Sequence, residues 1–274
     1  MQQIIQRWRI KYRYSLILLK ELVKTDFKLR YQGSFLGYIW SLLKPLFMFV
    51  ILYLLFGVIL NAGEGMPHYP VYLLLGLLLW NYFAEVTNTS VTAIVGKGDL
   101  LRKLNFPKYV IVLSGSFSAL INLFINFIVL GIFILFLGVD LRWSALLIPL
   151  TLVELFVFAI GVSFLLSALY VRFRDISYIW EILMQAAFYI TPIFYLLNFV
   201  DAKSHLAAQV LLLNPMAQII QDTRYLLVTS QTLTFEQLYI NDWYRLVPIS
   251  IVILLTFCGA WYFRKKSAGF AEEV

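Results

Sequence analysis

Three features are scarce in this chain of 274 residues: it has one cysteine, two histidines, and charges on only 14% of its residues. The single Cys258 cannot form an intrachain disulfide or a cysteine metal site, and His68 and His205 stand alone in separate connections, as solvated loop histidines do. A phosphate-binding loop of the form G-x-x-x-x-G-K-[ST] is also missing. The sequence therefore carries no ATPase site, and no grouping of nucleophile, base and acid favours an enzyme.

Apolar sequence, in contrast, is abundant. Hydrophobic residues make up 61% of the chain and aromatic residues 17%. A soluble domain of this length could not bury so much apolar surface, so the sequence predicts an all-α polytopic membrane protein with six transmembrane helices in a single domain, 1–274. The expected spans, each near or above the roughly 20 residues needed to cross a bilayer, are about 37–60, 69–92, 110–137, 146–170, 176–197 and 246–263.

The 22 Lys and Arg residues are unevenly distributed between the two sides of these spans. Most precede the first span or lie in the second connection, the fourth connection and the C-terminal tail, whereas the other side has only Arg142, Lys203, Arg224 and Arg245. The positive-inside rule then places both termini in the cytoplasm of a multi-pass protein. The same asymmetry accounts for the net charge of +7 without a nucleic-acid partner.

The N-terminal segment, 1–33, has two chemically different faces at helical spacing. One face is apolar and aromatic and the other is basic, which predicts an amphipathic helix in the plane of the cytoplasmic leaflet. A cytosolic helix packed against a partner subunit is the alternative. The apolar face holds Ile5, Trp8, Tyr12, Leu16, Leu19, Leu22 and Val23, and the basic face holds Arg13, Lys20, Lys24 and Lys28.

Two short cytoplasmic connections contain more than topology requires. Segment 96–108, GKGDLLRKLNFPK, carries leucines and a phenylalanine at helical spacing, which predicts a short amphipathic helix at the membrane surface, with a plain basic loop as the alternative. The fourth connection, YVRFRDI, contains Asp175, which we expect to pair locally or to cap the fifth span.

On the other side, segment 198–245 is long for a connection between spans. Two helical stretches within it are separated by Asn214 and Pro215, where proline removes an amide donor and kinks or restarts the chain. We interpret it as a re-entrant helical pair over an extracytoplasmic exit. An ordinary surface domain is the alternative.

Within the spans, acidic and aromatic residues suggest different functions. Glu85, Glu154 and Glu181 would be the proton sites of a proton-coupled carrier, although none has an oppositely charged partner one turn away. Aromatic rings away from the span ends could line a pore through which sugars slide, or could simply pack against lipid. The pore candidates are Tyr38, Tyr53, Phe56, Phe188, Tyr189 and Tyr195.

Several motifs, in a fixed order, resemble the membrane subunits of bacterial ABC exporters for polysaccharides, the group that moves lipid-linked O-antigen, capsule and teichoic acid. The most specific lies in 26–46 and reads RY-x-G-S-x-L-G-x-x-W-x-x-x-x-P, from Arg30 to Pro45. Further similar blocks are GLLLWNYF, LLRKLNFPK, RFRDI and the late Asn214-Pro215 pair. The resemblance covers essentially the whole chain and does not distinguish O-antigen from teichoic acid.

The resemblance implies a homodimer of six-span subunits that binds two copies of a separate cytoplasmic ATPase, which would hold the ATP and magnesium. Segment 96–108 would be the coupling helix in a groove of the ATPase, and Arg174 and Asp175 a second contact. Segment 1–33 would be a gate helix. The first and fifth spans would line the channel for an undecaprenyl-linked polysaccharide. Segment 198–245, with Asn214 and Pro215, would form the outer gate. The expected ATPase contacts in the coupling helix are Asp99, Leu100, Arg102 and Lys103.

Three other functions remain open at this point. The same fold could export drugs or other small lipophiles. A proton-coupled carrier would depend on Glu85 or Glu154 and not on an ATPase, and a structural scaffold would transport nothing.

Overall fold

The computed structural model describes residues 2–30, 37–104, 106–239 and 241–273, which form helices joined by short connections and no strand. Residues 31–36 of the Arg30–Pro45 motif lie outside the described residues. The helices, in chain order, are α1 Gln2–Arg30, η1 Gly37–Ile39, α2 Trp40–Leu52, η2 Tyr53–Ile59, α3 Tyr69–Gly96, α4 Gly98–Lys103, α5 Tyr109–Phe136, η3 Trp143–Leu147, α6 Ile148–Arg172, α7 Ile176–Ile190, α8 Leu197–Lys203, α9 His205–Leu212, α10 Pro215–Leu227, α11 Phe235–Leu238, η4 Asp242–Arg245, α12 Leu246–Lys266 and α13 Phe270–Glu273.

Five helical segments of the described chain are long and apolar enough to cross a membrane, which confirms an all-helical membrane protein. They are Gly37–Ile59, Tyr69–Gly96, Tyr109–Phe136, Trp143–Arg172 and Trp243–Lys266. The expected fifth span, 176–197, is shorter than predicted, because α7 ends at Ile190. Pro192 explains this end, since a proline disfavours helical backbone at the residue before it, and Thr191 is extended.

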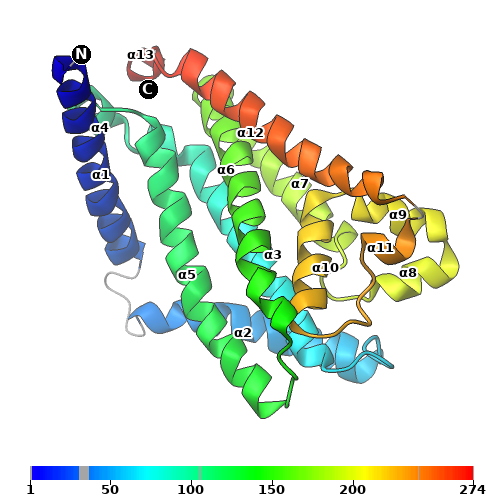
Figure 1. The fold of residues 1–274 in the computed structure, drawn as a ribbon. Coiled ribbons are helices and arrows are strands. Elements are labelled where there is room, and N and C mark those ends of the chain that lie inside the picture. The colour runs from blue at the N-terminus through cyan, green and yellow to red at the C-terminus, as the bar shows by residue number, and fades with distance from the viewer. Residues whose placement is uncertain (1, 31–36, 105, 240, 274) are drawn as a thin grey trace.

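The two termini lie at the same end of the helical bundle (Figure 1), and the C-terminal helix α13 contacts α4. From that end α7 leads away and α12 returns, with the short helices α8, α9 and α11 gathered between them (Figure 1). Helix α7 is apolar, but its 15 residues fall below the length of a full span.

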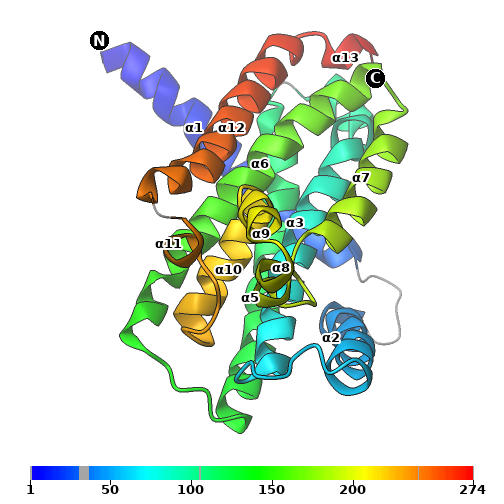
Figure 2. The ribbon, with the colours of Figure 1, turned by 90° about the vertical axis from the view of Figure 1, so that its right-hand side faces the viewer.

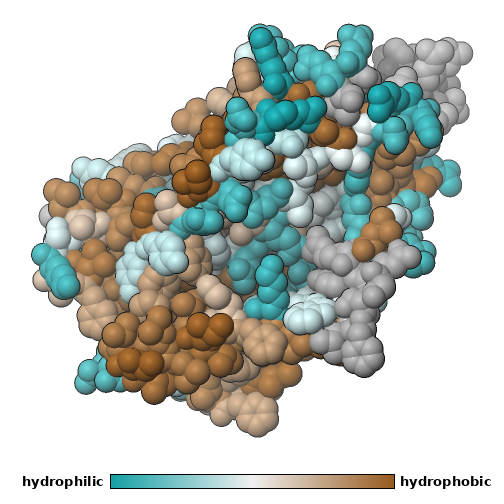
Figure 3. Space-filling view, turned by 180° about the vertical axis from the view of Figure 1, so that it is seen from behind, coloured by the Kyte–Doolittle hydropathy of each residue, from teal (hydrophilic) through white to brown (hydrophobic). Residues whose placement is uncertain are grey.

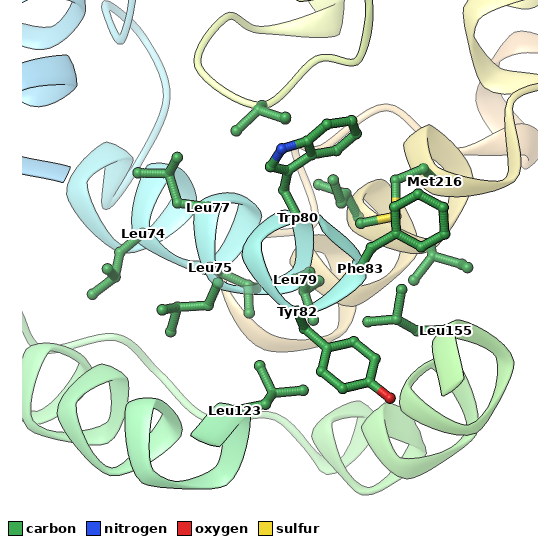
Figure 4. Close-up of a cluster of buried hydrophobic side chains, with 14 of the residues drawn as sticks. Leu74, Leu75, Leu77, Leu79, Trp80, Tyr82, Phe83, Leu123, Leu155 and Met216 are labelled. Carbon is green, nitrogen blue, oxygen red and sulfur yellow. The ribbon is translucent and has the colours of Figure 1, made fainter. Parts of the chain in front are cut away.

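Helix α3 is the centre of the packing. Most of its side chains are buried, and it contacts α2, α5, α6, α7 and α10. Figure 4 shows leucines and aromatic rings of α3 meeting Leu123 of α5, Leu155 of α6 and Met216 of α10. Residues 71–80 of α3 are apolar and buried on every side, which suits such a position because every face meets protein.

Helices α6 and α12 approach closely at two glycines. A Cβ atom on Gly259 would lie 2.2 Å from the carbonyl oxygen of Gly161, so neither position tolerates a side chain without movement. At the same crossing Thr256 Oγ1 donates to the carbonyl oxygen of Val157 at 3.1 Å. Small residues and an interhelical hydrogen bond are typical of helix packing inside membranes.

Helix α2 crosses the lower part of the bundle transversely in Figure 1 and is seen nearly end-on in Figure 2. Much of its apolar surface faces away from the rest of the chain, and Phe47 and Ile51 are 58% and 60% exposed. Hydrophobic side chains dominate the lower part of the face in Figure 3, and hydrophilic ones gather toward the end where the termini lie. In a membrane this apolar surface is covered by lipid or by another protein chain.

Helix α1 lies beside α5 (Figure 1). Leu18, Leu19 and Leu22 pack against the cluster formed by the membrane-surface ends of α3, α5 and α6. Leu16, which the sequence placed on the same apolar face, is 62% exposed. The helix therefore contacts its own chain with only part of the predicted apolar face.

Candidate functional site

The first element of the site is α4, which follows α3 directly at the end where the termini lie (Figure 1). It covers only Gly98–Lys103, because Leu104 has extended backbone, and so it is shorter than the helix expected over 96–108. Leu101 is buried, whereas Asp99 and Arg102 have exposed side chains that form an ion pair of 3.2 Å. The helix thus holds its apolar side on the bundle and presents charges outward.

An ion pair joins this end of the bundle to α1. The Nζ atom of Lys97, the residue before α4, lies 2.9 and 2.8 Å from the two carboxylate oxygens of Asp26. Ser114 of α5 donates to the same carboxylate at 3.0 Å. One cluster therefore connects the N-terminal helix, the start of α4 and a transmembrane helix.

A cavity of about 960 Å³ lies between α2, α3 and α5. Three stripes at helical spacing form its walls: Trp40, Lys44, Met48 and Ile51 on α2, Leu78, Asn81, Glu85 and Asn88 on α3, and Ala119, Asn122, Leu123 and Asn126 on α5. Because Tyr82 and Asn122 are close to the midpoints of α3 and α5, the cavity lies near the middle of the bundle. Its walls are unusually polar for that depth.

Hydrogen bonds tie the three walls together. Asn122 Nδ2 donates to Glu85 Oε2 at 3.0 Å, and Asn126 Nδ2 donates to the carbonyl oxygen of Ser41 at 3.3 Å. The buried Oδ1 atom of Asn122 has no hydrogen-bond partner among the described residues. The cavity therefore contains both satisfied polar groups and a free acceptor, as expected of a site that binds a polar ligand.

A second buried polar group lies on the other side of α3. Arg224 of α10 is fully buried and donates to the carbonyl oxygens of Tyr72, Pro192 and Ile193 at 3.0, 2.6 and 2.6 Å. Its guanidinium carbon lies 3.6 Å from the centre of the Tyr72 ring. Gly76 makes room for it, since a Cβ atom there would lie 2.3 Å from Nη2. Arg224 thus fixes the non-helical segment after α7 against α3.

Carboxylates and amides connect α10 with α6 and with the start of α12. Gln218 Nε2 donates to Asp222 Oδ2 at 2.8 Å and to Glu154 Oε2 at 3.4 Å. Arg245 pairs with Asp222 at 3.2 Å and with Glu236 at 3.6 Å. Burial raises the pKa of Asp222, against the opposing effects of Gln218 and Arg245. Glu154 therefore has polar neighbours that are distant in the sequence.

The sequence was compared with models of known protein families. Residues 17–228 match the family model for ABC-2 type transporters. The chain belongs to the ABC-2 type transporter family. This confirms the resemblance that the motifs indicated.

Two relatives of this ABC-2 chain align over nearly its whole length, and a third aligns over about three quarters of it. It is 28% identical over 272 residues to the O-antigen export system permease protein RfbA of Myxococcus xanthus, covering 99% of this chain and 100% of the relative. The protein of the same name from Klebsiella pneumoniae is 31% identical over 273 residues, covering 96% and 98%. The polysialic acid transport protein KpsM of Escherichia coli is 23% identical over 218 residues, covering 76% and 80%.

Four of the six expected pore aromatics of the ABC-2 chain contact one ring, that of Phe194. Phe188 lines the polar cavity, and Tyr189 is 68% exposed beside it. Tyr53 and Phe56 instead pack into the aromatic cluster around Tyr69 and Phe194. Tyr195 also contacts Phe194, and Tyr38 is half-exposed and stacks on Phe27 of α1. Phe188 and Tyr189 contact Phe194 as well, so these two rings, Phe56 and Tyr195 meet around one ring, whereas Tyr38 lies apart, against α1.

The predicted outer-gate pair begins a helix. Asn214 is the N-cap of α10, and its Oδ1 accepts from the amide of Met216 at 3.0 Å. Pro215 occupies the first helical position, where a missing amide donor costs nothing. The two residues therefore restart the chain after α9, one of the two outcomes expected of them.

The fourth connection is exposed. Arg174 lies over the Tyr170 ring at 5.2 Å. Asp175 occupies the N-cap position of α7 but makes no capping hydrogen bond, so the expected cap is absent. In α1, Arg13, Lys20 and Lys24 are exposed, and the side chains of Trp8 and Tyr12 lie outside the described part of the chain.

Sequence reasoning missed the asparagines of the cavity and the role of Arg224. One signal was present: Asn122 and Asn126 are spaced i, i+4 in an otherwise apolar span, which places two amides on one helix face. For Arg224 no local signal exists, because its acceptors come from segments 31 to 152 residues away.

Proposed function

We propose that this chain is the permease subunit of an ATP-driven exporter that carries undecaprenyl-linked cell-surface polysaccharide, O-antigen or wall teichoic acid, across the bacterial cytoplasmic membrane. The observation that carries the proposal is the alignment with O-antigen export permeases from end to end. A polar cavity midway along apolar helices supports it, because a hydroxyl-rich substrate needs polar partners inside the bilayer.

Two copies of a cytoplasmic ATPase would supply the energy. Helix α4 is suited to contact them, since Asp99 and Arg102 are exposed on a helix that is anchored by Leu101. Lys103, Leu100 and the exposed Arg174 and Asp175 would complete the contact. ATP and magnesium would be bound by the partner.

Two copies of this chain would form the channel. The exposed apolar surface of α2 and η2 is available for that pairing, and α7 would be the sixth crossing. Helices α8 to α11, in 198–245, would form a re-entrant outer gate, and α1 an interfacial gate helix. The basic residues of the N- and C-terminal segments favour a cytoplasmic location for both termini.

The test is purification of the tagged full chain in mild detergent, with identification of co-purifying proteins by mass spectrometry. ATPase activity is then measured with and without lipid-linked glycan. Co-purification of an ATPase whose rate responds to the glycan supports the proposal. The result that would favour a proton-coupled carrier has two parts. The chain is isolated without an ATPase, and its transport depends on protons and is abolished by Glu85→Gln or Glu154→Gln.

A further inference from the structure

Lys44 occupies an unusual position in the polar cavity. It lies on α2, one turn after Trp40, and its side chain is exposed to the cavity. Neither a hydrogen bond nor an ion pair joins it to another of the described residues. A lysine within a membrane-spanning helix usually pairs with an acidic group or reaches the interface, because an isolated charge in hydrocarbon is costly.

The acidic residue of the cavity is already engaged. Glu85 accepts a hydrogen bond from Asn122 on the wall formed by α3 and α5. Across from Lys44, Asn81 and Asn88 present amides that donate and accept hydrogen bonds, and Asn88 is exposed. The cavity therefore combines one ammonium group with one carboxylate that is hydrogen-bonded to Asn122, several neutral hydrogen-bonding groups and the flat ring of Trp40.

These groups match a ligand that carries an anion next to hydroxyl groups. An ammonium group forms strong charge-assisted hydrogen bonds with phosphate oxygens, amides pair with hydroxyls, and an indole ring packs against the apolar faces of sugars. The volume of about 960 Å³ is at the upper end of small-molecule sites, which allows a phosphate and the adjoining sugar but not a polymer.

We propose that this cavity binds the phosphate-bearing head group of a lipid, with Lys44 on the phosphate and Asn81 and Asn88 on neighbouring hydroxyls. The proposal rests on the proposed function in taking the head group to be that of the lipid-linked glycan during its passage. The hydrocarbon tail stays outside the cavity, in the bilayer. A bilayer phospholipid offers the same phosphate chemistry and is the second possible source.

Native mass spectrometry of the purified full chain tests the site without requiring transport. The protein is titrated with undecaprenyl diphosphate in one series and with phosphatidylglycerol in another. Lys44→Gln removes one charge-assisted hydrogen bond, so we expect undecaprenyl diphosphate to bind roughly tenfold to hundredfold more weakly. Asn88→Leu, at an exposed position of the same cavity, should weaken it in the same direction.

Lys265→Gln is the matched control, because Lys265 is exposed on α12 beside Trp261 and outside the cavity. The Lys265→Gln variant should bind both probes as tightly as the unmodified protein does. If Lys44→Gln and Asn88→Leu weaken the binding of undecaprenyl diphosphate alone, the site is assigned to the export substrate. If they weaken the binding of phosphatidylglycerol equally, the site is assigned to lipid phosphates in general. Unchanged binding of both probes by Lys44→Gln and Asn88→Leu overturns the proposal.

The two proposals fail in different ways. If deletion of the gene removes surface polysaccharide but Lys44→Gln binds both probes normally, the site is wrong and the function stands. If deletion leaves surface polysaccharide intact while Lys44→Gln binds undecaprenyl diphosphate more weakly, the proposed site stands and the proposed function is wrong.

Discussion

Lys97 and Asp26 form an ion pair of 2.8 Å between the residue that precedes α4 and the last turns of α1. These segments are separated by two transmembrane segments in the sequence, and Ser114 of α5 binds the same carboxylate. A force on α4 can therefore reach α1 through a single contact, without passing along the length of any span. If α4 contacts an ATPase, this pair is the shortest described route from the ATPase to the proposed gate helix.

Breaking this pair should affect export more than stability. Lys97→Ala and Asp26→Asn should each lower the free energy of unfolding by about 1.5–3 kcal/mol, because only 25% and 23% of the two side chains are exposed and charge-assisted hydrogen bonds are lost. We expect surface polysaccharide to fall severalfold in both variants, as measured by immunoblot, at normal membrane levels of the protein. The exchange Asp26→Lys with Lys97→Asp should recover part of the loss, and equal export by all variants would contradict the link.

Charge reversal on α4 should separate ATP hydrolysis from transport. Arg102→Glu with Lys103→Glu changes two exposed side chains and leaves the buried Leu101 in place, so insertion should be normal. Export should be lost while ATP hydrolysis by the partner no longer responds to lipid-linked glycan. Arg142→Glu, an exposed residue in the loop between α5 and α6, is the control and should export normally. Full coupling in the double variant would rule out α4 as the contact.

The apolar spans could be predicted from the sequence because hydropathy is a local property. The end of α7 was also predictable in principle, since Pro192 lies within the expected span. The site was not. Lys44 stands beside asparagines of α3 and α5, and Asp26 meets Lys97, only because the helices pack together. An isolated polar residue in an apolar helix indicates that a partner exists but does not identify it.

Arg224 should be essential for folding. In Arg224→Met the buried carbonyl oxygens of Pro192 and Ile193 lose the donor that the guanidinium supplies, at a cost of about 1–3 kcal/mol for each unsatisfied group. We expect the free energy of unfolding to fall by about 3 kcal/mol or more, or the protein to be degraded. Thermal unfolding in detergent, followed by tryptophan fluorescence, measures the change. Arg142→Met removes an exposed arginine and should leave the midpoint unchanged, and a stable Arg224→Met would show that the buried guanidinium is dispensable.

Stability should depend on pH through Asp222. Burial raises the pKa of this carboxyl in the folded protein, so folding takes up a proton and the free energy of unfolding falls as pH rises above the usual aspartate pKa of about 4. Arg245 and Gln218 oppose the effect, and Glu236 and Glu154 are the nearby carboxyls. Asp222→Asn should flatten the dependence of the unfolding midpoint on pH above about pH 4. Asp140→Asn, at an exposed loop residue, should leave it unchanged.

The crossing of α6 and α12 provides a paired test of packing within the membrane. Gly259→Leu would place a side chain where even a Cβ atom lies 2.2 Å from a backbone oxygen of α6, so the helices must separate. Overpacking of this kind costs about 1–3 kcal/mol or more, and loss of the Thr256 hydrogen bond to α6 adds to it.

Gly131→Leu is the matched control, because a Cβ atom there meets nothing within 4 Å. Thermal unfolding in detergent should show a lower midpoint for Gly259→Leu and a shift within about 0.5 kcal/mol for Gly131→Leu. Equal midpoints would mean that α12 does not pack on α6 through Gly161 and Gly259.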